Sequence, residues 1–405
     1  MREQLALQID PASQAEVLPE AWQADPLFAA RLQAVDVAAY GRSRNHLDGA
    51  VTGLSPWISH GFAPVPQVVA WLVRYRGLRA RHKLAYEFAW REFFHHVWGQ
   101  LGDGILESVR PGLAGVRYAP ELPASVREAR TGIPTVDVAV RTLYHSGYLH
   151  NHARMWLAAF VVHYAKVDWR VGADWMLAHL LDGDLAANHL SWQWVAATFS
   201  RKPYLFNAEN VARHAPPEWQ CAGTALDADY ATLDALARGS GRMLFGGRGG
   251  EPVSEPPPLA CPPPALLQAG DGLPPCIEKG RTVVLLHPWH LRPPARKPGG
   301  ALVLGVVHLP FHRQFPWSAQ RWQFVLPRLR RACDRLFVGD ATMLALPLAG
   351  RRVIAERVRY AGYREVLPAL ATELRDPPRW LPDPPRLCES FSQFWSRYGP
   401  EGRRR

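Results

Sequence analysis

The chain has 405 residues, of which 48% are hydrophobic and 20% charged, a balance typical of an ordinary soluble globular protein. Its five Cys form no closely spaced pair, which argues against a disulfide framework, a zinc ribbon and an iron–sulfur cluster. The first residues contain no apolar signal-peptide core, and the longest apolar stretch, MWLAAFVVHYA, is too short to span a bilayer. We therefore expect a cytoplasmic protein that has no membrane partner.

The net charge of +11 is concentrated near the C-terminus, where residues 301–405 hold 18 Lys and Arg against 9 Asp and Glu. Such a region attracts a polyanion such as DNA, but it is equally typical of a solvated basic surface.

In chain order, residues 1–38 predict a helical extension, and 39–215 predict a helical domain. Apolar residues recur at helical spacing from 136 to 164, with a break expected at Gly147. Residues 216–280 are rich in Gly and Pro and predict an extended linker. Residues 281–385 predict a basic α/β domain: the strand-like runs TVVLLH, ALVLGVVHL and RLFVGD alternate with a helix that Pro327 should interrupt or kink. Residues 386–405 are left as a basic tail.

Two segments in the first half combine helix signals with polar chemistry. Ser55 followed by Pro56 predicts a helix start; its free amides, beside the Thr52 hydroxyl, suit a phosphate, whereas a plainly capped helix is the alternative. Glu87 and Arg91 are four residues apart and predict a surface ion pair. The alternative is a Glu87 carboxyl that is partly buried by aromatic residues and exchanges a proton near neutral pH.

Two later segments place polar groups on helix faces. Tyr148, Asn151 and Met155 share a face if their segment is helical, with Arg154 beside them, which is more typical of a cleft than of a core. The three His of HSGYLHNH have no carboxylate or Cys at ligand spacing, so we expect no metal. In DGDLAANHLSWQWV, Asp182 and Asp184 predict a helix start. Asn188 and Trp192 then follow Asp184 on one face, and Trp194 points away.

These segments, read together, resemble the FAD-binding domain of the DNA photolyase and cryptochrome family. The resemblance rests on Y---R---DG, LSP, E--WREF, TG-P-VD---R-L---G--HN--RM, DWR-G and DGDLAAN----WQW, which occur in this order from about residue 40 to 207. It implies an all-α FAD-binding domain, and in this chain the predicted smaller α/β domain follows that domain instead of preceding it. That second domain is either a permuted relative of the antenna domain that usually precedes this one in the family or an unrelated domain.

The resemblance also implies roles for individual residues toward FAD. Arg154 would pair with Asp182 beside the flavin ring, Asp184 would bind the adenosine side, and Asn188 would face flavin N5. The phosphate and ribityl parts would be bound by Tyr40, Thr52, Leu54, Ser55 and Arg91. Trp192 and Trp169 would carry electrons to the flavin, and Tyr118 is the aromatic nearest to the position where the family usually has the distal Trp. A second, antenna chromophore is left unassigned.

The cleft residues resemble those of the cyclobutane-dimer photolyases, in which the matching positions contact the flipped dimer: Glu87, Trp90, Asn151, Met155 and Trp194. The implied activity is that of a deoxyribodipyrimidine photo-lyase, a lyase that uses light and reduced FAD to split pyrimidine dimers in DNA. A photosensor of cryptochrome type that binds FAD and repairs nothing is the alternative. His152 replaces the usual Arg of the family, and LFNAE replaces RIFNP, which are changes that weaken the expectation of tight duplex binding.

Overall fold

The N-terminal part of the chain is helical. The computed structural model describes residues 16–245, 250–294 and 299–400. Aspartates cap the early helices: Asp25 accepts a hydrogen bond from Phe28 N, and Asp36 accepts one from Ala39 N. The helices of this part are α1 (Glu20–Gln23), α2 (Pro26–Gln33), α3 (Val37–Ser43), α4 (Ser55–Ser59), α5 (Val65–Arg76) and α6 (Lys83–Leu101).

A second helical group follows and contains the segments with the strongest helical spacing. The break expected at Gly147 is present, because α8 ends at Ser146 and Gly147 is its C-cap. The elements are α7 (Ala124–Arg127), α8 (Pro134–Ser146), α9 (Asn151–Ala159), the π-helix η2 (Phe160–Tyr164), α10 (Trp169–His179), α11 (Leu185–Val195) and α12 (Ala208–His214). In the described ranges, no helix is long and apolar enough to cross a membrane.

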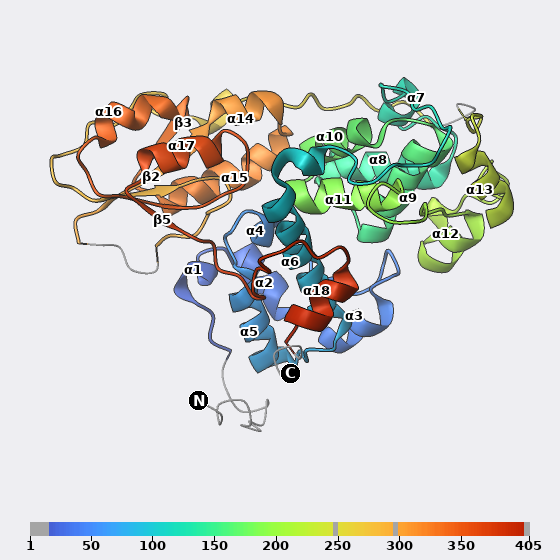
Figure 1. The fold of residues 1–405 in the computed structure, drawn as a ribbon, viewed down its shortest axis with the longest axis horizontal. Helices are drawn as coiled ribbons and strands as arrows, with labels where there is room; N and C mark the ends of the chain where they lie inside the picture. The colour runs from blue at the N-terminus through green and yellow to red at the C-terminus, as the bar shows by residue number, and fades with distance from the viewer. Residues whose placement is uncertain (1–15, 246–249, 295–298, 401–405) are drawn as a thin grey trace.

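The segment expected to be an irregular linker contains one regular helix, α13 (Tyr230–Arg238). Its Leu233 and Ala237, four residues apart, are fully buried against the α8–α12 group. Flanking glycines and prolines hide this short amphipathic pattern in the sequence, so the prediction for residues 216–280 was wrong over α13. After it, the chain crosses the molecule to the sheet (Figure 1).

The C-terminal part is an α/β unit with a five-stranded parallel sheet in the order β3-β2-β1-β4-β5. Strands β2 and β3 are added on one side of β1, and β4 and β5 on the other. The boundary between β1 and β4 is therefore the point at which the strand order switches. The strands are β1 (Val283–Leu286), β2 (Leu302–His308), β3 (Arg335–Gly339), β4 (Val353–Glu356) and β5 (Glu373–Arg375), and the helices are α14 (Leu309–Gln314), α15 (Ala319–Ala332), α16 (Ala345–Leu348) and α17 (Tyr363–Leu370).

Helix α15 continues through Pro327, contrary to the interruption expected there. Proline removes one backbone donor. Here the apolar face of the helix compensates, because Trp322, Leu326 and Leu329 are all buried in the core. Tertiary packing therefore outweighs the local preference.

The hydrophobic interior is divided into two cores. One is built mainly by α7–α13 and the loops between them. The other is shared by the N-terminal helices and the α/β unit, which are far apart in the sequence. Trp57 of α4 packs edge-on against Phe324 of α15 at 5.2 Å between ring centroids, and Trp98 of α6 packs against Tyr360 at 4.9 Å. Helix α6 lies between the two helical groups (Figure 1).

The expected basic tail forms a packed helix over part of its length. Helix α18 (Phe391–Tyr398) lies against α6, with Phe394 buried. Trp395 packs on Tyr86 of α6 at 4.5 Å between ring centroids. These aromatic contacts explain why the segment is ordered as a helix despite its charge.

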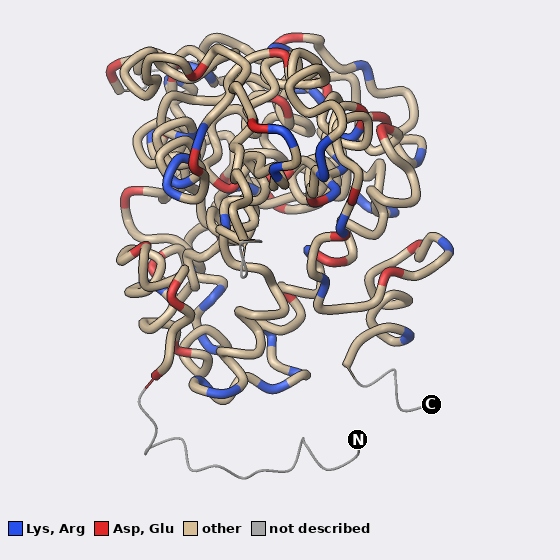
Figure 2. The backbone as a smooth tube through the Cα atoms, turned by 90° about the vertical axis from the view of Figure 1, so that its left-hand side faces the viewer, with Lys and Arg blue, Asp and Glu red and all other residues tan. Residues whose placement is uncertain are grey.

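The arginines that give the C-terminal part its positive charge are largely used in ion pairs. Figure 2 shows acidic and basic positions interspersed along the backbone. Arg364 binds Asp103 of the helical part through two hydrogen bonds of 2.7 and 2.8 Å, and Arg328 binds Asp25 at 2.7 Å. Much of the charge concentrated after residue 300 therefore joins the two parts of the protein.

The central strand β1 should dominate the stability of the shared core. Leu285 is fully buried there, and Leu346 is 84% exposed on α16. We expect Leu285→Ala to lower the free energy of unfolding by about 2–5 kcal/mol, since it removes buried methyl groups and leaves a cavity. Leu346→Ala, the matched control, should change it by less than about 0.5 kcal/mol. Urea denaturation followed by tryptophan fluorescence measures both, and equal losses would contradict the assignment of β1 to the core.

Candidate cofactor and substrate site

A cavity of about 320 Å³ lies between α3, α6, α9 and α11. This volume falls in the range of small-molecule and cofactor pockets. Most residues singled out from the sequence line it, although they come from four separate segments of the chain. Those residues are Tyr40, Thr52, Ser55, Glu87, Trp90, Arg91, Asn151, Arg154, Met155, Asp182, Asp184, Asn188 and Trp192.

Two arginine–aspartate pairs form one wall of the cavity. Arg154 of α9 donates from Nη2 to Asp182 Oδ2 at 2.8 Å, and its Nε donates to the Leu149 carbonyl at 2.9 Å. Arg91 of α6 donates from Nη2 to Asp184 Oδ2 at 3.2 Å. The turn between α10 and α11 thus holds two carboxylates, each paired with a guanidinium from a different helix.

Asp184 is the N-cap of α11, as the sequence predicted, and it accepts a hydrogen bond from Ala187 N at 3.0 Å. Its Oδ2 also lies 2.6 Å from His95 Nε2. Burial opposes ionisation, but His95, the positive Arg91 and the Ala187 amide outweigh it and hold the pKa of Asp184 below its ordinary value. Asp184 is therefore a buried carboxylate that stays charged.

Asn188 and Trp192 follow Asp184 along the same face of α11, and both line the cavity. The Asn188 side chain donates from Nδ2 to the Ala173 carbonyl of α10 at 2.8 Å. Trp192 lies directly against α10 at Gly172, where an added Cβ would come within 2.3 Å of the indole ring. The α10–α11 packing therefore fixes both side chains.

Glu87 does not pair with Arg91, which corrects the surface ion pair expected from their spacing. Its partner is Arg44, whose Nη1 donates to Glu87 Oε1 at 2.5 Å. Burial raises the pKa of Glu87, and the Arg44 charge and hydrogen bond oppose that rise. Glu87 is thus a partly buried carboxyl on the cavity wall, as in the alternative interpretation of its sequence.

Trp90, Asn151 and Met155 complete the opposite side of the cavity. Asn151 Nδ2 lies 3.4 Å from Met155 Sδ, so the two side chains contact one another across one turn of α9. One face of the Trp90 ring stacks on Phe391 of α18, with 4.1 Å between ring centroids and 10° between planes. The C-terminal helix therefore supports a residue of the cavity wall.

Two residues singled out from the sequence do not line the cavity. Leu54 is fully buried in the core. Trp194 is 37% exposed and packs on Tyr204, since it points away from the α11 face that carries Asn188. The expected Ser55 cap is also absent: Ser55 is the first residue of a five-residue helix, and Leu54, already in helical conformation, occupies the cap position. The amide-lined phosphate site expected at this helix start therefore has little structural basis, although Ser55 still lines the cavity.

The aromatic residues expected to carry electrons stand on segments that pack against one another. Trp192 is on α11, and Trp169 is buried at the start of α10, where its Nε1 donates to Ser108 Oγ at 3.0 Å. Tyr118 is half-buried and immediately precedes Ala119, which pairs with Val167 in an isolated parallel bridge. Burial raises the pKa of Tyr118, and the negative charge of Asp168, the N-cap of α10, raises it further.

A cluster of histidines lies beside the cavity, at the start of α9 and the end of α12. The His152 ring lies 5.6 Å from that of His150 and 5.5 Å from that of His214. Within the described part of the chain, no group of three or more His, Cys, Asp or Glu is arranged to hold a metal ion. Burial lowers the pKa of His150 and of His152 to about 4.

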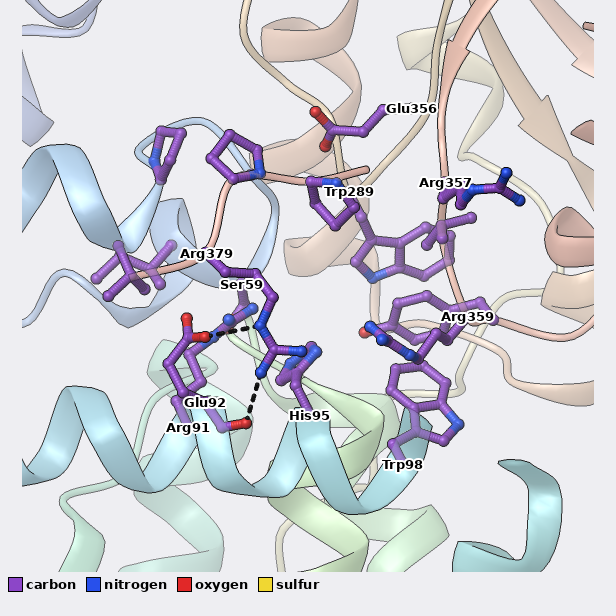
Figure 3. Close-up of a pocket in the computed structure, with 18 of the residues that line it drawn as sticks. Ser59, Arg91, Glu92, His95, Trp98, Trp289, Glu356, Arg357, Arg359 and Arg379 are labelled. Atoms are coloured by element: carbon purple, nitrogen blue, oxygen red, sulfur yellow. Dashed lines mark hydrogen bonds and ion pairs between the residues drawn. The ribbon is translucent and has the colours of Figure 1, made fainter. Parts of the chain in front are cut away.

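A smaller cavity of about 100 Å³ lies behind Arg91 and His95, at the carboxyl ends of β1 and β4 (Figure 3). Arg379 donates from Nε to Glu92 Oε2 and from Nη2 to the Glu92 carbonyl, both at 3.0 Å. Trp289 stacks on Tyr360 at 3.6 Å between ring centroids. Arg91 thus lines both cavities, and His95 lines the smaller one.

Sequence reasoning missed Arg44 and His95 as site residues. His95 follows Arg91 by four residues on α6, so helical spacing alone places it on the face that carries Glu87 and Arg91. Arg44 stands in the Y---R---DG segment, but its contact with Glu87 joins residues 43 positions apart.

The walls of the main cavity fit a polar cofactor with anionic groups. Four buried side-chain atoms of these lining residues have no hydrogen-bond partner in the described structure: Arg44 Nε, Arg91 Nε, His152 Nδ1 and Asp182 Oδ1. Buried polar atoms are normally paired, so these donors and this acceptor suit a ligand.

Comparison with known proteins agrees with this fit. Residues 84–224 match the family model described as the FAD binding domain of DNA photolyase. The deoxyribodipyrimidine photo-lyase of Streptomyces griseus is 36% identical over 163 residues, which cover 40% of this chain and 36% of the relative. The cryptochrome DASH of Ostreococcus tauri is 31% identical over 191 residues, which cover 45% and 35%. The chain thus matches about a third of the length of these relatives.

Among solved structures, the cryptochrome of Synechocystis sp. PCC6803 is similar, with 26% identity and a TM-score of 0.41, covering 46% of this chain and 42% of that one.

FAD binding should depend on the Arg154–Asp182 pair. We expect Arg154→Met to weaken FAD binding roughly 10- to 100-fold, because it leaves a buried carboxylate unpaired in the cavity wall. Arg213→Met, which breaks an exposed ion pair with Glu209, is the control and should leave binding unchanged. Titration of the apoprotein with FAD, followed by flavin fluorescence, gives both dissociation constants. Equal affinities would place FAD away from Arg154.

The histidine cluster should make the protein sensitive to acid. His150 and His152 have pKa values of about 4 in the folded state against 6.5 as the ordinary value, so between these pH values the unfolded chain binds more protons. Stability should therefore fall as the pH is lowered from 6.5 to 4. His152→Gln should make this fall shallower, whereas replacing the exposed His145 should not. Urea unfolding across this pH range tests it, and parallel curves for all three proteins would contradict it.

Proposed function

We propose that this protein is a light-driven enzyme that splits cyclobutane pyrimidine dimers in DNA, since residues 84–224 match the model of the FAD binding domain of DNA photolyase. The observation that supports the proposal best is the shared cavity: Glu87, Trp90, Asn151 and Met155 line the same space as Arg154, Asp182, Asp184 and Asn188. A substrate bound to the first set would lie next to a cofactor bound to the second.

The residues of the second set would hold the cofactor. When bound in its reduced form, FAD supplies the electron that light makes available. The Arg91–Asp184 and Arg154–Asp182 pairs fix the polar walls, and Asn188 is oriented by the Ala173 carbonyl. The buried Trp169 and Trp192 would supply electrons from the protein, with Tyr118 as the outermost member.

The residues of the first set would receive the dimer. A dimer must leave the base stack to enter the cavity, which costs less for a damaged base than for an intact one, and aromatic rings such as Trp90 stabilise the extruded base. Glu87, with its raised pKa, can donate or share a proton with the dimer carbonyl that gains negative charge. Arg44 orients the Glu87 carboxyl for this contact.

A photosensor of cryptochrome type is the second candidate, and the stack of Trp90 on Phe391 favours it. A change in the cavity on illumination would act on Trp90 and through it on α18. In that case flavin would respond to light, but no dimer would be split.

Dimer splitting by the reduced, FAD-loaded protein under blue light distinguishes these two functions. We expect Glu87→Gln to lower the splitting rate roughly 10- to 100-fold, because the amide can still donate a hydrogen bond but cannot transfer a proton to the dimer carbonyl. Glu209→Gln, on the exposed surface of α12, is the control. The recovery of thymine ultraviolet absorbance in a dimer-containing oligothymidylate measures the rate. Flavin bands that bleach under light while no dimer is split would favour the photosensor.

A further inference from the structure

The α/β unit inserts one arginine beneath the turn that carries Asp182 and Asp184. Arg321, in the first turn of α15, is 1% exposed. It donates from Nη1 to the Leu177 carbonyl at 3.2 Å and from Nη2 to the Gly183 carbonyl at 2.6 Å. Its guanidinium carbon lies 3.9 Å from the centre of the Trp317 ring, which covers its other side.

Arg321 binds the turn so closely that residue 183 has to be glycine. A Cβ at Gly183 would lie 2.3 Å from Arg321 Nη1 and 2.9 Å from the Leu177 carbonyl. Neighbouring contacts hold the same region: Ser318 N donates to the Ala178 carbonyl at 2.8 Å, and His60 Nε2 lies 3.0 Å from the Leu181 carbonyl. The end of α10 and the following turn are therefore fixed by side chains and backbone from both ends of the chain.

The position of Arg321 is costly for a structural residue. Burial of a guanidinium removes its hydration, and its hydrogen-bond partners are neutral carbonyls, while its Nε has no partner. Burial lowers the pKa of Arg321 to about 10, and the charges of Asp182 and Asp184 act in the opposite direction. An apolar residue of similar length would pack against Trp317 without this cost.

The charges around the turn do not cancel without a ligand. Asp182 is already paired with Arg154, and Asp184 with Arg91 and His95. Burial lowers the pKa of His95, and the charge of Asp184 opposes this effect. Arg154, Arg91 and Arg321 then face two carboxylates, and Arg321 contributes the positive charge in excess.

We propose that Arg321 is a positioning residue of the flavin site, which fixes the turn through its two carbonyl contacts and whose positive charge stabilises the negative charge that FAD gains on reduction. Arg321 does not line the cavity, so it acts through the turn and through the electric field rather than by contact with the cofactor. The proposal rests on FAD binding in the main cavity, as in the function proposed above. It also means that the site is incomplete without the α/β unit.

Two substitutions in the full-length protein separate the charge of Arg321 from its packing. Arg321→Gln keeps a donor and removes the charge, whereas Arg321→Lys keeps the charge and loses the two-pronged contact. Arg330→Gln, on the same helix and paired with Asp271 outside the site, is the control. Spectroelectrochemical titration of the FAD-loaded proteins gives the midpoint potential, and fluorescence titration of the apoproteins gives the dissociation constant.

We expect the potential of Arg321→Gln to shift to more negative values, while Arg321→Lys and Arg330→Gln stay near the wild-type potential. Equal shifts in the Gln and Lys variants, or no shift in either, would overturn the proposal. If Arg321→Gln holds too little FAD for titration, the dissociation constants decide. Binding roughly tenfold tighter by the Lys variant supports the role of charge, and equal binding contradicts it. A wild-type protein that takes up no FAD would instead refute the proposed function itself.

Discussion

The turn between α10 and α11 is the constraint on which the site depends. Its two carboxylates face the cavity, and its carbonyl groups face the α/β unit. Guanidinium groups from α6 and α9 bind the carboxylates, and Arg321 of α15 binds the carbonyls. Because three distant segments meet at this turn, a displacement of any one of them would change the relative positions of Asp182, Asp184 and Asn188. Precise placement of these groups is what a bound cofactor requires.

The shared hydrophobic core provides the rigidity behind this arrangement. Helix α6 contributes residues to both sides: Arg91 and Glu87 line the cavity, while Trp98 packs against Tyr360 of the α/β unit. The α/β unit therefore supports the helix that carries Glu87 and Arg91.

The features that the sequence could predict are those that depend on the spacing of residues within one short segment. The break at Gly147 and the common face of Asp184, Asn188 and Trp192 follow from helical periodicity and capping. Strands β1, β2 and β3 follow from short apolar runs, whereas β4 and β5 were not predicted. The resemblance to the photolyase and cryptochrome family was predicted from ordered motifs, and residues 84–224 match the model of the FAD binding domain of DNA photolyase. The roles of individual residues toward FAD and DNA remain predictions.

The features that sequence could not predict depend on contacts between distant residues. Arg44 rather than Arg91 pairs with Glu87, because the relevant distance is across two helices and not along one. The packing of α18 on α6 depends on aromatic rings about 300 residues apart in a segment whose charge suggested a tail. Helix α13 shows the same limit. Its two buried residues, Leu233 and Ala237, indicate a helix only once the rest of the fold that covers them is known.

The division into two cores has a consequence for how the protein is made. The N-terminal helices are synthesised first, but their apolar faces pack on a sheet whose strands are synthesised last. The second core, in contrast, takes its buried residues from positions 122–243 and therefore needs no part of the sheet. During synthesis the middle of the chain can therefore fold before the N-terminal helices have their packing partner. Until the sheet has been synthesised, the apolar faces of α2, α4 and α6 stay exposed and are the surfaces most prone to aggregation. Such long-range pairing is also slow, because loop closure precedes the contacts that stabilise it.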